Sequence, residues 1–157
     1  MKNAMLFLLA CVSSLTYAQT TTQETMNAPS GYNEELAHAL GADEHGMKKY
    51  VLVVLKTGPN TMLKGPERDA MFKGHFANIQ RLADEGKIAL AGPFDGSEGW
   101  RGLFVFATGD IELAKSWVAT DPVIVNGEMV AEYHKYYGSA ALMMVTRLHK
   151  TIALKDF

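Results

Sequence analysis

The sequence predicts an α+β domain with a four-stranded antiparallel sheet, and two stretches carry this prediction. Residues 50–56 form an apolar, β-branched run with almost no polar interruption, which is typical of a strand buried on both faces. Residues 66–86 place apolar side chains at steps of three and four, which indicates an amphipathic helix. The stretches that follow complete the order strand, helix, strand, strand, helix, strand.

This order is the split βαβ, or ferredoxin-like, arrangement. Turns rich in glycine, proline and aspartate separate most of the expected elements. We expect strands at residues 50–56, 88–94, 100–108 and 130–137, main helices at 66–86 and 110–121, a short helix at 32–40, and a final helix or extra strand at 140–149.

The helix at 66–86 carries one residue that does not fit its pattern. Pro66 suits the first turn, and Gly86 suits a left-handed end. The apolar stripe comprises Met71, Phe72, Phe76, Ile79, Leu82 and Ala83. His75 points the same way as the stripe, and an inward histidine needs a hydrogen-bond partner or a chemical role. It is therefore either a satisfied core residue or part of a functional site.

The second main helix ends in an acidic residue of similar interest. Asp110 is the expected N-cap, and Pro122 prevents the helix from continuing into the connector at 123–127. Asp121 extends the apolar stripe of this helix and stands at its C-terminal end, where a carboxylate meets the negative end of the dipole. Asp121 either forms a simple turn with Pro122 or has a functional role.

The composition limits the classes of function. The chain has 157 residues, 48% of them apolar, and a net charge of −2, so no basic excess points to nucleic acid. No ligand spacing typical of a metal site and no phosphate-binding or dinucleotide-binding glycine motif is present in the sequence. We expect no metal and no cofactor, and a small molecule as ligand or substrate.

The N-terminal residues predict export. Residues 1–18 have the charge, apolar core and small terminal residues of a signal peptide. Cleavage after Ala18 would leave a periplasmic or secreted protein with no membrane attachment. The alternative is a lipid anchor at Cys11, the only cysteine. We expect a linker and short helix at 19–47, the folded domain at 48–138 and a C-terminal extension at 139–157.

The sheet is expected to need a partner. Two helices cover only one face of a four-stranded sheet, yet residues 50–55 and 103–106 are apolar at successive positions. A second apolar face usually means an interface, and a symmetric homodimer that packs sheet on sheet is the simplest solution.

Four short stretches together resemble one protein family. They are H-F-A-N-I-Q-R-L from His75, L-A-G-P-F from Leu90, W-V-A-T-D-P from Trp117, and Gly127. In this order and spacing they resemble the YCII-related (YciI-like) family of dimeric α/β-barrel proteins. The resemblance implies a ferredoxin-like fold, a dimer, and an active site that pairs His75 with Asp121. It implies no particular substrate.

A paired carboxylate orients a histidine ring, fixes its tautomer and favours its protonated form, which makes a sound general acid–base unit. The sequence therefore predicts an acid–base enzyme of isomerase or lyase type. The alternatives are a dimer that binds a small ligand without turning it over, and a structural dimer in which His75 and Asp121 only link two elements.

Further candidates lie near the second and third strands. Gly92 and Pro93 could let backbone approach a ligand, with Phe94 as an apolar wall, or could simply form a strand bulge. Arg101 could hold an anionic substrate group or lie solvated beside the hairpin.

Overall fold

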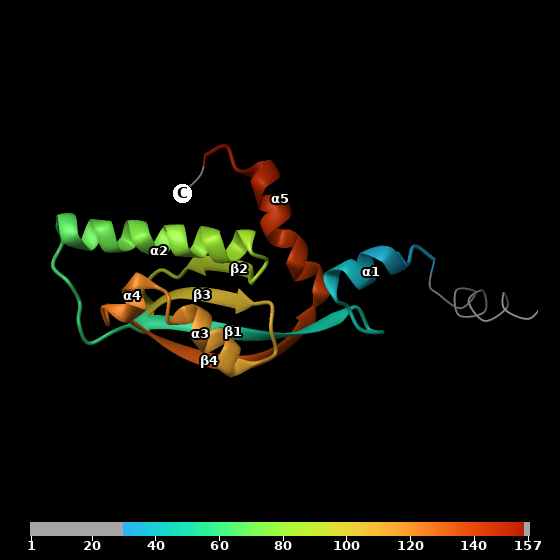
Figure 1. Cartoon of the computed structure of the whole chain (residues 1–157), viewed down its shortest axis with the longest axis horizontal. Coiled ribbons are helices and arrows are strands. Elements are labelled where there is room, and N and C mark those ends of the chain that lie inside the picture. The colour runs from blue at the N-terminus through green and yellow to red at the C-terminus, as the bar shows by residue number, and fades with distance from the viewer. Residues whose placement is uncertain (1–29, 156–157) are drawn as a thin grey trace, which may run out of the picture. The chain divides into compact units, whose positions relative to one another are not determined.

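One antiparallel sheet in the order β2–β3–β1–β4 forms the centre of the fold (Figure 1). The structure is a computed structural model that describes residues 30–155, and the compact unit begins at Glu34. The strands are β1 Met47–Thr57, β2 Ile88–Pro93, β3 Trp100–Phe106 and β4 Met129–Ser139. The helices are α1 Glu34–Leu40, α2 Pro66–Asp84, α3 Ile111–Val118, α4 Pro122–Val125 and α5 Val145–Ile152, with short 3₁₀ turns at Ser97–Gly99 and Ala140–Met144.

This architecture confirms the α+β class and the ferredoxin-like order of elements. The expected signal peptide at 1–18 and the first part of the linker lie outside the described residues. Among residues 30–155, no helix combines the length and the apolar character that a membrane span requires.

The main core lies between the sheet and α2, α3 and α4. Val53 of β1 faces Phe104 on β3 and Tyr133 on β4, so alternate residues of three strands point toward the helices. The fully or nearly fully buried members are Val51, Val53, Leu55, Met71, Leu82, Ile88, Phe104, Phe106, Ala114, Val118, Val123 and Met129. Because this core includes residues from α2 and α4, it fixes these two helices over the same face of the sheet.

The C-terminal extension covers part of the opposite face. Tyr50, Ala89 and Val105 form a second buried cluster, against which Leu142 and Met143 pack. Residues 140–152 are helical, so the extra-strand alternative is wrong. The extension thus shields one side of the face that we expected a partner to cover. Trp100, Val130 and Tyr136 keep about two fifths of their surface exposed.

Two expectations about the helices are wrong. Phe76 does not belong to the buried stripe of α2, because it is 49% exposed, whereas Asn78 is buried in that stripe. The connector expected at 123–127 contains α4, which begins at Pro122 and is capped by Asp121. A proline fits the first turn of a helix as well as it ends the preceding one, and here Pro122 does both.

Gly58 lies where two loops approach each other closely. Its amide donates to the Glu128 carbonyl at 2.8 Å, and a Cβ at position 58 would lie 2.2 Å from the Gly127 carbonyl oxygen. We expect Gly58→Ala to destabilise the fold by about 2–3 kcal/mol, because the backbone must move apart. Urea unfolding of both proteins measures the difference.

Gly92→Ala is the matched control, because a Cβ at position 92 meets no atom within 4 Å. It should change the free energy of unfolding by no more than about 0.5 kcal/mol. Equal effects of the two substitutions would contradict the close approach at Gly58.

Candidate functional site

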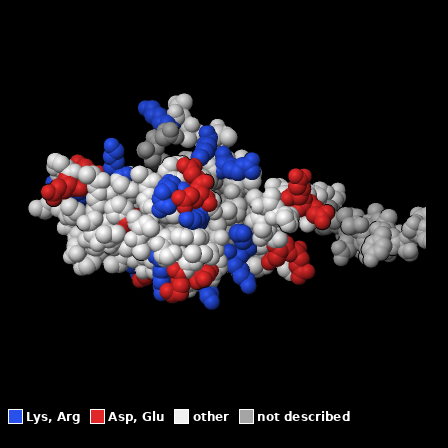
Figure 2. Space-filling view, viewed as in Figure 1, with Lys and Arg blue, Asp and Glu red and all other residues white. Residues whose placement is uncertain are grey.

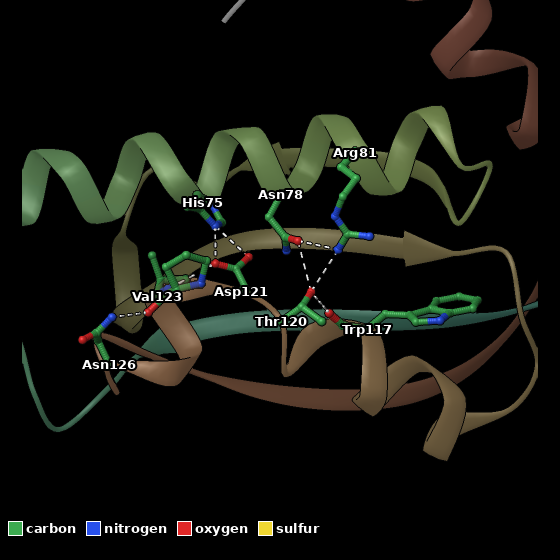
Figure 3. Close-up of polar contacts among 9 residues, drawn as sticks. His75, Asn78, Arg81, Trp117, Thr120, Asp121, Val123 and Asn126 are labelled. Carbon is green, nitrogen blue, oxygen red and sulfur yellow. Dashed lines mark hydrogen bonds and ion pairs between the residues drawn. The ribbon is translucent and has the colours of Figure 1, made fainter.

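His75 and Asp121 meet in the core between α2 and the start of α4 (Figure 3). The His75 Nδ1 atom lies 2.9 Å from Asp121 Oδ1 and 2.8 Å from Oδ2. Asp121 is 1% exposed and His75 is 7% exposed, so little water screens the contact. The two residues stand 46 positions apart in the sequence and come from different elements.

Asp121 has a second task, as the N-cap of α4. Its Oδ1 atom accepts a hydrogen bond of 3.1 Å from the Val123 amide. Asp121 follows the C-terminal end of α3, as expected, and it also sits at the positive end of the next helix. This hydrogen bond helps to hold the carboxylate in the position from which it contacts the histidine ring.

Close packing of α2 against α4 brings the pair together. A Cβ at Gly74 would lie 3.1 Å from Pro122 Cγ, so the absence of a side chain lets the helix approach the start of α4. His75 follows Gly74 directly and Asp121 directly precedes Pro122. The same contact thus sets the distance between ring and carboxylate.

The two nitrogens of the His75 ring have different environments. Nδ1 faces the carboxylate, so this nitrogen carries a proton that it donates to Asp121. Nε2 has no hydrogen-bond partner among the described residues, and it is not one of the fully buried atoms without a partner. The side chain is 9% exposed. Nε2 therefore keeps contact with solvent, whereas the hydrogen-bonding capacity of Nδ1 is met by Asp121.

Aromatic rings surround the imidazole. The His75 ring centre lies 6.0 Å from that of Phe72, 5.3 Å from Phe76 and 6.3 Å from Phe104. Phe72 and Phe76 are its neighbours on α2, and Phe104 lies on β3 beneath it. The imidazole ring thus has aromatic side chains around it, which suits contact with an organic molecule.

A polar network lies one helical turn beyond His75 (Figure 3). Arg81 Nη2 donates to Asn78 Oδ1 at 2.7 Å, and the Thr120 hydroxyl is 3.0 Å from the same oxygen. Because a guanidinium only donates, it fixes the orientation of the Asn78 amide. Asn78 Nδ2 is the one fully buried side-chain nitrogen or oxygen atom in residues 30–155 that has no hydrogen-bond partner. Sequence analysis missed Asn78, although its spacing from His75 places both on one face.

A second buried ion pair, which sequence analysis also missed, ties α2 to the start of β4. Glu128 is 0% exposed and accepts from Arg68 Nη2 at 2.7 Å, Arg68 Nε at 3.1 Å and the Met62 amide at 2.7 Å. Burial raises the pKa of the Glu128 carboxyl, but these hydrogen bonds and the charges of Arg68 and Arg101 outweigh burial and hold the pKa below its ordinary value.

The remaining candidates gather at one end of β2 and β3. Gly92 and Pro93 end β2, and both are exposed. The Phe94 amide donates to the Arg101 carbonyl at 3.1 Å, and the Phe94 ring packs edge-on against Trp100 at 5.3 Å. Among residues 30–155, no hydrogen bond, ion pair or ring contact joins Gly92, Pro93 or Phe94 to His75, so their role in substrate binding stays a prediction.

Two shallow hollows lie elsewhere on the described surface. Their volumes are about 350 and 470 Å³. Asp43, Lys49 and Tyr137 line both, and neither is lined by His75 or Asp121. The Tyr137 hydroxyl donates to the Asp43 carboxylate at their edge, which raises the pKa of Tyr137 and lowers that of Asp43. The hollows are therefore separate from the His75 pair.

Neither the charges nor the side-chain clusters indicate another class of site. On the face shown in Figure 2, basic and acidic side chains are interspersed and form no continuous basic stripe. Within the described range, no three histidine, cysteine, aspartate or glutamate side chains gather as metal ligands would.

No model of a known protein family matches the chain, and no curated protein is significantly similar to it. The resemblance to the YCII-related family therefore stays a prediction that rests on the quoted residues.

The lowered pKa of Glu128 predicts how stability depends on pH. A carboxyl whose pKa falls on folding stabilises the protein above its unfolded value, here 4.5, and this stabilisation is lost as pH falls through the folded value. We expect Glu128→Gln to lower the free energy of unfolding near pH 7, and the gap to the unchanged protein to shrink below about pH 4.5.

Urea unfolding between pH 7 and pH 3 measures this gap. Glu132→Gln is the control, because its exposed ion pair with Lys56 should contribute less than about 1 kcal/mol at any pH. A gap for Glu128→Gln that stays constant down to pH 3 would contradict the role assigned to the buried carboxylate.

Proposed function

We propose that the protein is a cofactor-independent acid–base enzyme, of isomerase or lyase type, that acts on a small organic molecule. The observation that supports this most is the asymmetry of the His75 ring. Its Nδ1 is engaged by a buried carboxylate, its Nε2 has no partner among the described residues, and aromatic side chains flank the ring.

Nε2 is the atom that transfers the proton in this proposal. With the proton of Nδ1 held by Asp121, the neutral ring presents a lone pair at Nε2 and can accept a proton from a C–H or O–H group. The imidazolium that forms is stabilised by the adjacent carboxylate, and it can return the proton to another atom of the same molecule. Asp121 is a positioning residue, because it touches only the ring and the backbone of α4.

The rival function is a purely structural link between α2 and α4. The absence of His75 from the lining of both hollows favours it. A structural link, however, uses only Nδ1. It gives no reason for Nε2 to have no protein partner among the described residues. The two functions differ in whether His75 can exchange protons with a bound molecule.

A direct test is hydrogen exchange in small carbonyl compounds. The purified protein is incubated in D₂O with a panel of 2-oxo acids, unsaturated acids and lactones, and loss of C–H signals is followed by NMR. We expect exchange in at least one compound, with His75→Gln slower by at least about 100-fold, which is the usual contribution of a general acid–base group. Asp121→Asn should also be slow, because an amide can hold the wrong tautomer of the ring.

His45→Gln is the matched control, since His45 is exposed and far from α2 in the sequence. It should exchange as fast as the unchanged protein. Exchange that survives in folded His75→Gln would contradict the proposed role of His75. Thermal unfolding of each variant separates loss of activity from loss of structure.

The proposal also includes a homodimer and export. Trp100, Val130 and Tyr136 expose apolar surface on the sheet face that the C-terminal extension leaves open. A second copy that packs there would remove this surface from water.

Light scattering should give twice the chain mass, and Val130→Lys should shift the protein toward the monomer. The control Leu154→Lys, at an exposed position in the extension, should remain a dimer. A stable monomer at micromolar concentration would overturn this arrangement.

A further inference from the structure

A surplus positive charge lies near the buried Glu128 carboxylate. Arg68 makes both side-chain hydrogen bonds to this carboxylate and so neutralises it. The charge of Arg101 also acts on Glu128, yet Arg101 forms no side-chain hydrogen bond or ion pair with any residue in the described range. Arg68 therefore uses its donors on the carboxylate, whereas the side-chain N–H groups of Arg101 are not engaged within the described range.

The backbone of β3 places Arg101 out of the regular ladder. Gly102 pairs with Leu55 and Trp100 pairs with Lys56, so Arg101 is the additional residue of a bulge. A bulge redirects a side chain, and such features are frequent beside active sites. The Arg101 carbonyl accepts from the Phe94 amide at 3.1 Å, which holds the bulge against the end of β2. Arg101 is half-buried, so water screens its charge only in part.

Phe104 on β3 connects the bulge to the His75 ring. Phe104, whose ring packs 6.3 Å from the imidazole, follows Arg101 by three positions on β3, which is about 10 Å along a strand. On the helix side, the Arg68 guanidinium lies 4.6 Å from the Phe72 ring centre, and Phe72 is 6.0 Å from His75. Phe72 thus lies beside both the Arg68 guanidinium and the imidazole.

From this arrangement we propose that Arg101 binds the anionic group of the molecule on which His75 acts, and that this group is a carboxylate. This inference rests on the proposed function and names its substrate class: small organic acids with an apolar or aromatic body. The guanidinium matches a carboxylate with two parallel hydrogen bonds. The body of the acid would lie along Phe72 toward Nε2.

The positive charge also suits the reaction. Removal of a proton near a carboxylate builds further negative charge on the molecule, and a fixed cation stabilises that charge as it develops. Glu128 and Arg68 hold the surroundings of Arg101 without consuming its donors. Arg101 would therefore orient the acid and lower the barrier to proton transfer.

The test compares benzoate with benzamide, which has the same ring but no charge. Binding is followed by NMR of backbone amides in the full chain. We expect benzoate to shift amides of β3 and α2 around Phe104 and Phe72, and benzamide to bind at least tenfold more weakly. Arg101→Gln should weaken benzoate at least tenfold, while Arg101→Lys, which keeps the charge without the paired donors, should weaken it less.

Arg147→Gln, at an exposed position on α5, is the control and should bind benzoate normally. Benzoate binding by a protein that shows no proton exchange would leave the anion site standing even if the proton-transfer function fails. Equal binding of benzamide, unchanged affinity in Arg101→Gln, shifts confined to other surfaces, or no binding of benzoate would each overturn the proposal. Proton exchange by the unchanged protein alongside any of these results would leave the function intact and remove only the anion site.

Discussion

The Asp121 carboxylate is the constraint on which the site depends. It is 1% exposed, it caps α4 through the Val123 amide, and it holds Nδ1 of His75. A buried carboxylate is stable only if hydrogen bonds replace its water, and here the donors are the backbone amide of Val123 and the Nδ1 atom of His75. Removal of either donor would leave a buried charge incompletely satisfied. The position of α4 and the orientation of the imidazole are therefore coupled, and the ring is oriented before any ligand arrives.

Two buried polar pairs attach α2 to the rest of the domain. Arg68–Glu128 lies near the beginning of the helix, and His75–Asp121 lies two turns later on the same side. Buried pairs gain little net stability, because desolvation offsets attraction, but a misplaced helix would leave two carboxylates unpaired. The apolar core would tolerate a small shift of α2 far better than these pairs would. We infer that the pairs set the register of α2 over the sheet, and with it the direction of Nε2.

Much of the fold was predictable because it follows from local patterns. The β-branched run of β1, the stripe of α2 and the N-cap Asp110 each identify an element within a few residues. The buried polar residues were harder to predict from the sequence. His75 stands out because it interrupts an apolar stripe, whereas Glu128 has no periodic neighbours that mark it as buried. Its partner Arg68 is 60 positions away, and only the tertiary fold joins them. The helical start at Pro122 was missed because proline was interpreted only as an end of the preceding helix.

The most direct measurement of the central claim is the reactivity of Nε2 in the native protein. Diethyl pyrocarbonate acylates unprotonated, accessible imidazole nitrogens, and peptide mass spectrometry locates the product. We expect His75 to react in the folded protein, more slowly than exposed His45, and at Nε2 alone because Nδ1 is held by Asp121. Modification of His75 only after unfolding would contradict the account, because the ring would then be a sealed structural link.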